Sequence, residues 1–232
     1  MHSKQYGEGS RAILAIHGWG GDHREFAPLA SRLPQGTRLL SVDLPGYGQS
    51  PPPGRWDLSL IVGGLAAVVD ETGLPALTLI GFCSGAFLAL LLARERKEQV
   101  ARLVMIDPFA YLPWYFKLFT LGEFGRRAYH ASFVSAAGRT IVNMVLQRRQ
   151  PTDSNFTEAF TRVDHEVTQR YLNMFSRFGG LESFRELGVA VDLVYGANTF
   201  TAVRRSVTLT WRQLCSGAKN INRFCTPLRW YS

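Results

Sequence analysis

Short apolar runs alternate with segments of helical periodicity along most of the chain. The runs that we interpret as buried β-strands lie at residues 11–16, 38–43, 77–80, 100–106 and 189–195. The segments with helical spacing lie at residues 26–33, 58–71, 84–93 and 201–214. Nearly continuous apolar strands are typical of sheets buried on both faces. The pattern therefore predicts an α/β fold, with a mostly parallel sheet and helices on both of its faces.

The first ten residues are polar, and we interpret them as a lead-in to the first strand. Residues 109–185 also depart from the strand–helix alternation. The aromatic residues gathered at the start of this segment are Tyr111, Trp114, Tyr115, Phe116, Phe119 and Phe124. Helical spacing follows over about 128–147 and 156–178. We predict a core of residues 1–109 and 186–232 with a helical cap of residues 110–185. The aromatic side chains either line an apolar acyl pocket or only join the cap to the core.

A strand that turns directly into a helix is predicted around Cys83. The strand that begins at residue 77 breaks at Gly81, and an apolar helix starts almost at once. So tight a bend needs small residues, and Gly81, Gly85 and Ala86 lie two before, two after and three after Cys83. Counting from Ser84 would instead place aromatic rings at the tightest points. The spacing therefore favours Cys83 at the apex of a nucleophile elbow, with cysteine where serine is usual.

The position of Cys83 indicates chemistry as well as shape. The backbone N–H of Ser84 would lie at a helix N-terminus, where negative charge is favoured. We expect that N–H to lower the thiol pKa of Cys83 and to stabilise an oxyanion. The alternative is that Cys83 is a small buried thiol in a glycine-rich strand end. Three other polar residues, His17, Asp43 and Asp107, also follow predicted strands, and ligands of parallel sheets bind at these carboxyl ends.

Composition limits the classes of function. The 232 residues suffice for one domain with a core, and no apolar run is long enough to span a membrane. The three cysteines lack metal-ligand spacing, so we expect no disulfide framework, metal or cofactor. The N-terminus lacks the apolar core of a signal peptide, and we expect a cytoplasmic protein. The net charge is +8, but the basic residues are scattered, so no nucleic-acid or membrane partner is expected.

Three motifs together resemble the α/β-hydrolase family. They are His17-Gly-Trp-Gly, Asp43-Leu-Pro-Gly-Tyr-Gly-Gln-Ser and Gly81-Phe-Cys-Ser-Gly, followed by the strand that ends at Asp107. The first two look most like capped esterases of the pimeloyl-carrier-protein methyl ester esterase type. The resemblance implies that Cys83 is the nucleophile and that the N–H groups of Trp19 and Ser84 form the oxyanion hole. It also implies that His17 holds its loop and that Asp43 anchors its own turn.

Two departures from this family change the expected chemistry. Cysteine replaces serine, so attack on an acyl carbon would give a thioester, and dehalogenases and epoxide hydrolases, which need a carboxylate here, are disfavoured. The family's base is a histidine after the last strand, but the last histidine here is His165, inside the predicted cap. Asp107 occupies an alternative position for the catalytic acid, or else it caps a turn before Pro108. His130 or His165 would replace the base only within hydrogen-bond reach of Cys83, which we do not expect.

The C-terminal segment looks atypical for the family. No acidic residue follows Asp192, and residues 211–232 show no clear period. We interpret this tail as a truncation or a shift of reading frame that removes the last strand and its histidine. The functional prediction is a hydrolase of small carboxylic esters or thioesters that uses Cys83. The alternatives are an impaired relative that binds a small apolar ligand, and an acyltransferase on the same scaffold.

Overall fold

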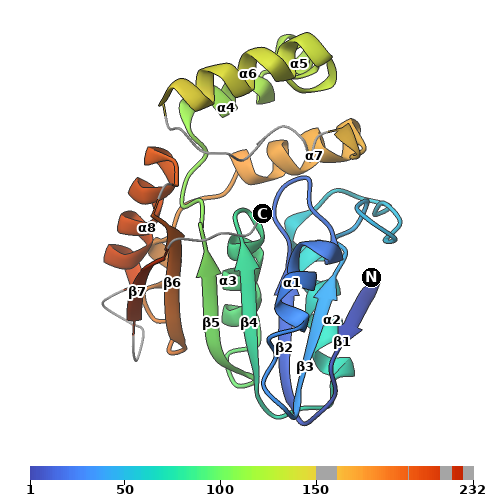
Figure 1. Cartoon of the computed structure of the whole chain (residues 1–232), viewed down its shortest axis with the longest axis vertical. Helices are drawn as coiled ribbons and strands as arrows, with labels where there is room; N and C mark the ends of the chain where they lie inside the picture. Colours follow the sequence, from blue (N-terminus) through green and yellow to red (C-terminus); the bar gives the residue numbers. More distant parts are fainter. Residues whose placement is uncertain (150–160, 198, 215–220, 227–232) are drawn as a thin grey trace.

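A seven-stranded sheet forms the centre of the computed structural model, which describes residues 1–149, 161–197, 199–214 and 221–226 (Figure 1). Among these residues the strand order is β1-β3-β2-β4-β5-β6-β7, and every pair is parallel except β1 with β3. The strands are β1 (Ser3–Tyr6), β2 (Arg11–Ile16), β3 (Thr37–Val42), β4 (Leu77–Phe82), β5 (Val100–Ile106), β6 (Ala190–Gly196) and β7 (Ile221–Thr226). The predicted α/β class and its mostly parallel sheet are confirmed.

Helices cover both faces of this sheet, and further helices lie above the carboxyl ends of its strands (Figure 1). Those beside the sheet are α1 (Ala27–Ala30), α2 (Leu58–Glu71), α3 (Gly85–Glu95) and α8 (Thr201–Leu214). Those between β5 and β6 are α4 (Trp114–Lys117), α5 (Gly122–Tyr129), α6 (Ala136–Arg149) and α7 (His165–Ser176). Shorter turns are η1 (His23–Phe26), η2 (Leu118–Thr120), the π-helical turn η3 (His130–Val134) and η5 (Glu182–Phe184).

The alternation of side chains along the strands divides the core between the two faces of the sheet. Leu79 of β4 is fully buried in the cluster that includes α2, α3 and α8. Its neighbour Ile80 points the other way, into a smaller cluster with Phe26 and Leu29. Helix α3 is apolar around its whole circumference because it packs against β2, β4 and β5 on one side and α2 on the other.

The polar N-terminal lead-in contains a strand that the sequence pattern did not predict. β1 pairs antiparallel with β3, with Ser3 opposite Val42 and Tyr6 opposite Leu39. Its side chains are mostly exposed and polar, so its sequence lacks the apolar pattern by which the inner strands are recognised. An antiparallel edge strand is common on an otherwise parallel sheet. Such a strand is defined by its pairing partner rather than by its own hydrophobicity.

The tail also contributes a strand, which corrects the expectation that the last strand is lost. β7 pairs in parallel with β6 from Val191–Ile221 to Gly196–Thr226. The amide of Asn222 donates a 2.9 Å hydrogen bond to Asp192 on β6, which also pairs with Arg102 on β5. The partner strand and this polar contact therefore order a segment that lacks a clean apolar period. Residues 215–220 and 227–232 of the tail lie outside the described residues.

Two helix predictions need new boundaries. The segment 26–33 is not one helix, because the η1 turn occupies residues 23–26 and α1 contains only residues 27–30. Pro34 and Gly36, which has a φ of 73°, prevent its continuation. Residues 110–185, for which a cap is predicted, are called the cap segment below. In this segment the π-helical turn separates α5 from α6, and α7 begins after the N-cap Asp164. Residues 156–160 lie outside the described residues. Among the described helices, none is long and apolar enough to cross a bilayer.

Candidate active site

Cys83 lies at the apex of the turn between β4 and α3. Its φ is 52°, a left-handed conformation that a non-glycine residue adopts only where the surrounding structure enforces it. The Cys83 N–H donates a 2.9 Å hydrogen bond to the carbonyl of Ile106, at the end of β5. Its carbonyl accepts from the N–H of Ala86 at 3.3 Å, in the first turn of α3. These bonds hold the strained residue at the carboxyl edge of the sheet.

Glycines on either side of Cys83 allow the strand and the helix to approach each other. A Cβ atom added at Gly81 would lie 2.4 Å from the Cα of Ala86. One added at Gly85 would lie 2.2 Å from the carbonyl oxygen of His17 and 2.3 Å from that of Ile16. Both contacts are far inside van der Waals range and involve backbone. The two positions therefore require glycine, which is the physical reason for the residue spacing noted in the sequence.

Two backbone amides face the sulfur of Cys83. The backbone N–H groups of Ser84 and Trp19 both act on the thiol in the direction that favours its ionised form. Ser84 is the N-cap of α3, and Trp19 lies in the loop after β2. The indole N–H of Trp19 donates a 2.8 Å bond to the carbonyl of Thr168 in α7. The structure therefore brings Cys83, Ser84 and Trp19 together, and the cap segment holds the loop that carries Trp19.

The surroundings of Cys83 raise its pKa overall, although its place at a helix N-terminus favours a lower one. Burial, as the largest cause, raises the pKa of Cys83 to about 12, and the negative charges of Glu25 and Asp107 add to the rise. The amides of Ser84 and Trp19 lower the pKa of the thiol but do not compensate. The Ser84 amide thus acts in the predicted direction, but the net pKa of Cys83 is raised. A thiol with this pKa is protonated at neutral pH.

His17 is a fixed structural residue of the loop after β2. The backbone N–H of Leu44 donates to its Nε2 at 3.0 Å, so the proton of the neutral ring lies on Nδ1. Nδ1 is 2.8 Å from the carbonyl oxygen of Gly18 and donates to it. Burial lowers the pKa of His17, which disfavours the imidazolium form. With both nitrogens bonded to backbone, His17 has no position from which to accept a proton from Cys83.

Asp43 connects two loops below this site. Its carboxylate accepts hydrogen bonds from the backbone N–H of His23 at 2.7 Å and of Gln49 at 2.9 Å. The His23 ring nitrogen Nδ1 lies 2.9 Å from both carboxylate oxygens, and His2 lies nearby with Nε2 at 3.9 Å. A Cβ added at Gly48 would lie 2.3 Å from the same carboxylate. The backbone and ring donors satisfy the Asp43 carboxylate, whereas the buried Nε2 of His2 has no hydrogen-bond partner among the described residues.

Asp107 follows β5 and has a φ of 43°. Its Oδ1 accepts a 3.1 Å hydrogen bond from the N–H of Gly196, and the side chain of Thr199 also bonds to it. Burial raises the pKa of Asp107, although these two donors lower it. The carboxylate thus caps the turn after β6, and its charge still reaches Cys83. Both interpretations made from the sequence, a turn cap and an acid of the site, remain compatible with this geometry.

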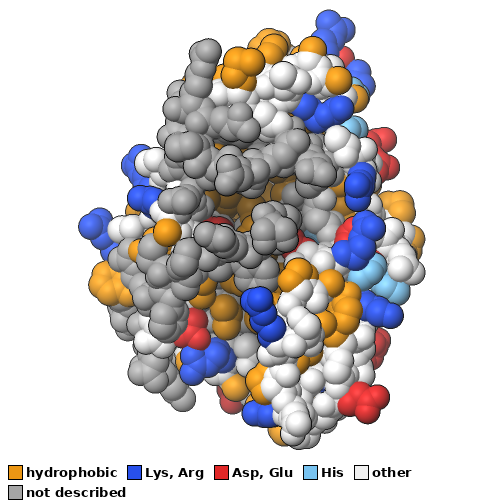
Figure 2. Space-filling view, viewed as in Figure 1, with side chains coloured by type: hydrophobic (Ala, Val, Ile, Leu, Met, Phe, Trp, Pro, Cys, Tyr) orange, Lys and Arg blue, Asp and Glu red, His pale blue; other side chains and the backbone are white. Residues whose placement is uncertain are grey.

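A pocket of about 350 Å³ opens above Cys83. Hydrophobic side chains gather at the top and in the lower middle of this face, and Lys and Arg are scattered over it (Figure 2). The residues that line the pocket are Trp19, Cys83, Ser84, Phe87, Phe109, Ala110, Tyr111, Leu112, Phe116, Lys117, Leu172, Phe175, Ser176, Phe178, Gly179 and Gly180. Its wall combines the elbow, the segment after β5, and α7 with the residues that follow it.

The aromatic residues of the cap segment divide between the two roles considered for them. Tyr111 and Phe116 line the pocket. Phe119 packs instead against Tyr129 and Phe133, in a cluster beside the pocket. Trp114 is 73% exposed and Phe124 is 66% exposed, so these two side chains do neither. The composition of the segment alone does not separate these roles, because the short helices α4 and α5 present rings to different sides.

No histidine is found among the described residues that line the pocket. His165 is bonded through Nδ1 to the hydroxyl of Tyr129 at 3.1 Å, and burial lowers the pKa of His165. His130 lies in the π-helical turn of the cap segment and its ring packs against the same Tyr129. The structure therefore does not bring either cap histidine to Cys83, in agreement with the expectation from the sequence.

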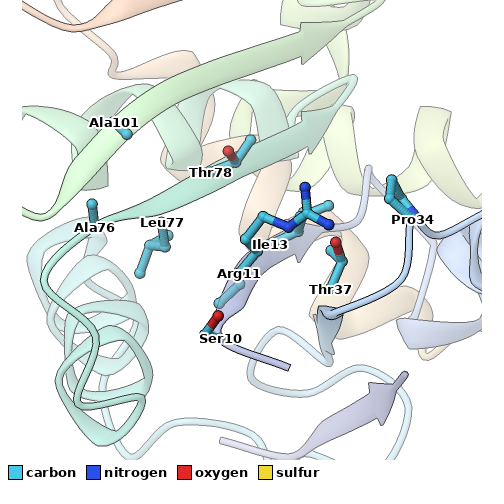
Figure 3. A pocket seen from close by; sticks show the side chains of 10 residues that line it. Ser10, Arg11, Ile13, Pro34, Thr37, Ala76, Leu77, Thr78 and Ala101 are labelled. Carbon is cyan, nitrogen blue, oxygen red and sulfur yellow. The ribbon is translucent and has the colours of Figure 1, made fainter. Parts of the chain in front are cut away.

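A second hollow of about 340 Å³ lies at the opposite edge of the sheet (Figure 3). Its walls come from the amino ends of strands β2 to β5, with Arg11, Thr37 and Leu77 among the lining residues. The Arg11 guanidinium donates to the carbonyl of Gln35 beside it. Parallel sheets bind ligands at the carboxyl ends of their strands, so the pocket above Cys83 is the stronger candidate.

Comparison with known proteins supports the same scaffold. The chain matches the family model of the α/β hydrolase fold over residues 11–218, and it belongs to this family. The esterase EaEST from Exiguobacterium antarcticum superimposes with a TM-score of 0.76 at 15% identity, covering 96% of this chain and 86% of the esterase. At that identity, the structural likeness supports the fold alone.

Curated relatives match the chain over a shorter stretch. Lipase LipV of Mycobacterium tuberculosis is 36% identical over 109 residues, which cover 47% of this chain and 41% of the lipase. The pimeloyl-[acyl-carrier protein] methyl ester esterase of Neisseria meningitidis is 34% identical over 102 residues, 44% of this chain and 38% of the esterase. The matched region thus spans about two fifths of the length of these curated relatives.

Proposed function

We propose that this chain is an acyl hydrolase that acts on small carboxylic esters or thioesters through Cys83. The observation that carries the proposal is the arrangement of the sulfur, which faces the amides of Trp19 and Ser84 at the floor of an apolar pocket. In this proposal the two amides form the oxyanion hole, and residues 110–185 act as a cap over the acyl group. The names of the lipase and esterase relatives agree with this substrate class.

The chemistry assigned to these residues is acyl transfer. The Cys83 thiolate attacks the carbonyl carbon, a C–S bond forms, and the carbonyl electron pair moves to the oxygen held by the two amides. Collapse of this intermediate breaks the bond to the alkoxide or thiolate leaving group, which takes a proton from solvent. Water then attacks the thioester and releases the acid and the Cys83 thiol. We assign Asp107 as the acid of the site, although its observed partners are the N–H of Gly196 and the side chain of Thr199.

The weak point of this mechanism is the first proton transfer. The pKa of Cys83 is about 12, and the described pocket residues offer no histidine to accept its proton. Hydroxide from solvent therefore has to generate the thiolate. We infer that hydrolysis is slow at neutral pH and restricted to activated esters. Whether water or another acceptor resolves the thioester distinguishes the hydrolase from an acyltransferase on the same scaffold.

Substitution of Cys83 tests the proposed nucleophile. We expect Cys83→Ala to reduce hydrolysis of p-nitrophenyl acetate and butyrate to the background rate of the buffer, because the change removes the proposed nucleophile from the floor of the pocket. Cys83→Ser should be equally inactive, since its hydroxyl ionises even less readily than the thiol. Release of p-nitrophenol at pH 9 is the measurement, with circular dichroism to establish that each variant is folded. Full activity in Cys83→Ala would remove Cys83 from the mechanism.

The pocket wall offers a test of where the acyl group binds. Ser176→Trp would fill space above Cys83, because Ser176 lies on the pocket wall in α7. We expect this change to lower kcat/KM for p-nitrophenyl butyrate about tenfold more than for the acetate, within the usual effect of a hydrophobic contact in a pocket. Ser3→Trp on the exposed strand β1 is the matched control and should leave the ratio unchanged. An equal loss for both esters would show that the acyl chain binds elsewhere.

A second candidate is a relative that binds a small apolar ligand without turning it over. The observation that favours it is the protonated state of Cys83 in a pocket without a described histidine. This candidate predicts saturable binding of a medium-chain fatty acid, with quenching of Trp fluorescence because Trp19 lines the pocket. The same protein would show no p-nitrophenyl ester hydrolysis above that of Cys83→Ala.

A further inference from the structure

The side chain of Glu25 contacts the loop that carries Trp19, although no motif in the sequence points to this residue. It belongs to the η1 turn that follows the loop. Its Oε2 accepts a 2.8 Å hydrogen bond from the backbone N–H of Gly18. A Cβ added at Gly21 would lie 2.8 Å from the same oxygen. The carboxyl group therefore packs against Gly18 and Gly21, and the absence of a side chain at Gly21 makes room for it.

Only the backbone of Gly18 separates Glu25 from Cys83. A Cβ added at Gly18 would lie 3.0 Å from the Cβ of Cys83, so this glycine packs directly on the elbow. Gly18 thus donates its N–H to the carboxyl group of Glu25 and packs its Cα side against Cys83. Trp19, whose N–H faces the sulfur, is the next residue. Glu25 holds this loop from below, and the bond from the Trp19 indole to Thr168 holds it from the cap side.

We propose that Glu25 is a positioning residue that fixes the Trp19 amide opposite Cys83 through Gly18 and opposes negative charge on the sulfur. When ionised, the Glu25 carboxylate repels both the Cys83 thiolate and an oxyanion, because all three are negatively charged. As a neutral acid, it would keep the loop in place without this repulsion. Its catalytic consequence rests on the function proposed above, but its effect on the thiol does not.

The surroundings of Glu25 support a group that changes charge near neutral pH. Burial raises the pKa of Glu25 to about 7, the Gly18 N–H lowers it, and the charge of Asp22 raises it further. Asp22 itself pairs with Arg24, and His23 bonds to Asp43. Across Gly18, Glu25 is the second largest cause of the raised pKa of Cys83, ahead of Asp107. The two groups therefore titrate as neighbours that disfavour each other's ionised form.

The thiol itself provides the direct test. In a Cys215→Ser, Cys225→Ser background, the rate of alkylation by iodoacetamide would be measured from pH 5 to pH 11. Replacing Glu25 by glutamine keeps its size and its oxygen acceptor for Gly18 but removes the charge. We expect Glu25→Gln to raise the alkylation rate about tenfold between pH 8 and pH 11, which corresponds to an apparent Cys83 pKa lower by about one unit. Glu186→Gln, at an exposed position, is the matched control and should not move the profile.

Two further measurements keep the proposal open to refutation if Glu25→Gln folds poorly. The unsubstituted protein should show a break in its alkylation profile near pH 7, where Glu25 ionises and the thiol becomes harder to deprotonate. Glu25→Ala, which removes the acceptor for Gly18, should lose ester hydrolysis that Glu25→Gln retains. A profile without the break, or the same Cys83 pKa in the folded glutamine variant, would overturn the proposal. Since alkylation needs no turnover, this failure is distinct from failure of the proposed hydrolase.

Stability supplies an independent readout with a defined sign. A raised pKa means that folded Glu25 binds its proton more tightly than the unfolded chain does, where the usual value is 4.5. Its contribution to stability is therefore fully present below pH 4.5 and is lost as the pH rises through about 7. We expect the Tm of Glu25→Gln to exceed that of the unsubstituted protein at pH 8, with the difference shrinking toward pH 5. A difference independent of pH would contradict this assignment.

Discussion

Gly85→Ala is expected to unfold the chain or to lower its melting temperature severely. The added Cβ would lie 2.2 Å from the carbonyl oxygen of His17 and 2.3 Å from that of Ile16. Both atoms belong to the backbone at the end of β2, which is hydrogen bonded in the sheet between β3 and β4. Relief of the overlap would separate α3 from the sheet. Overpacking of a rigid core costs about 3 kcal/mol or more, a large share of the 5–15 kcal/mol typical of a domain.

Gly63→Ala is the matched control for this prediction. Gly63 lies inside α2 with open space around it, so an added Cβ meets no atom within 4 Å. Alanine at an exposed helical position should raise stability by about 0.5–1 kcal/mol, because glycine loses more backbone entropy on folding. Thermal unfolding followed by circular dichroism compares the two variants. Equal melting of Gly85→Ala and the unsubstituted protein would mean that the elbow is not packed as described.

Local patterns predicted the inner parts of the fold and missed its edges. Helix α2 has the predicted bounds because Asp57 caps its start and its last turn is followed by Gly73, with a φ of 63°. The inner strands are apolar on both faces, so their own residues identify them. β1 and β7 are the outermost strands and acquire their structure from β3 and β6. A partner strand at long sequence distance leaves no signal in the local pattern of the segment that it orders.

The site shows the same division between local and distant causes. The spacing of Gly81, Cys83 and Gly85 predicted the bend because steric overlap between adjacent elements is a local property. The net rise in the thiol pKa was not predicted, because its main causes, burial and the charge of Glu25, come from elsewhere in the fold. The amide of Ser84 acts as expected but is outweighed. Residue type and spacing indicated the position of the candidate nucleophile, whereas its protonation state depends on groups that only the folded structure brings near it.

Reactivity of Cys83 is expected to rise about tenfold for each pH unit between pH 8 and pH 10, about a hundredfold in all. The thiolate is the reactive form, and with a pKa of about 12 its fraction is still increasing steeply at pH 10. In this range Glu25 is already ionised, so its titration does not distort the slope. Iodoacetamide alkylation of the Cys215→Ser, Cys225→Ser protein, followed by intact mass, gives the rates. Hydrolysis of p-nitrophenyl butyrate should follow the same slope if Cys83 is the nucleophile.

A short unstructured peptide with one cysteine in the same buffers is the control, because an unperturbed thiol with a pKa of about 8.5 approaches its maximal rate within this range. A plateau for Cys83 below pH 9 would instead mean that the amides of Trp19 and Ser84 outweigh burial and Glu25. The thiolate would then be available without a base, as in cysteine enzymes with an activated nucleophile. The slope between pH 8 and pH 10 therefore distinguishes a dormant thiol, which depends on solvent hydroxide, from one that its own oxyanion hole activates.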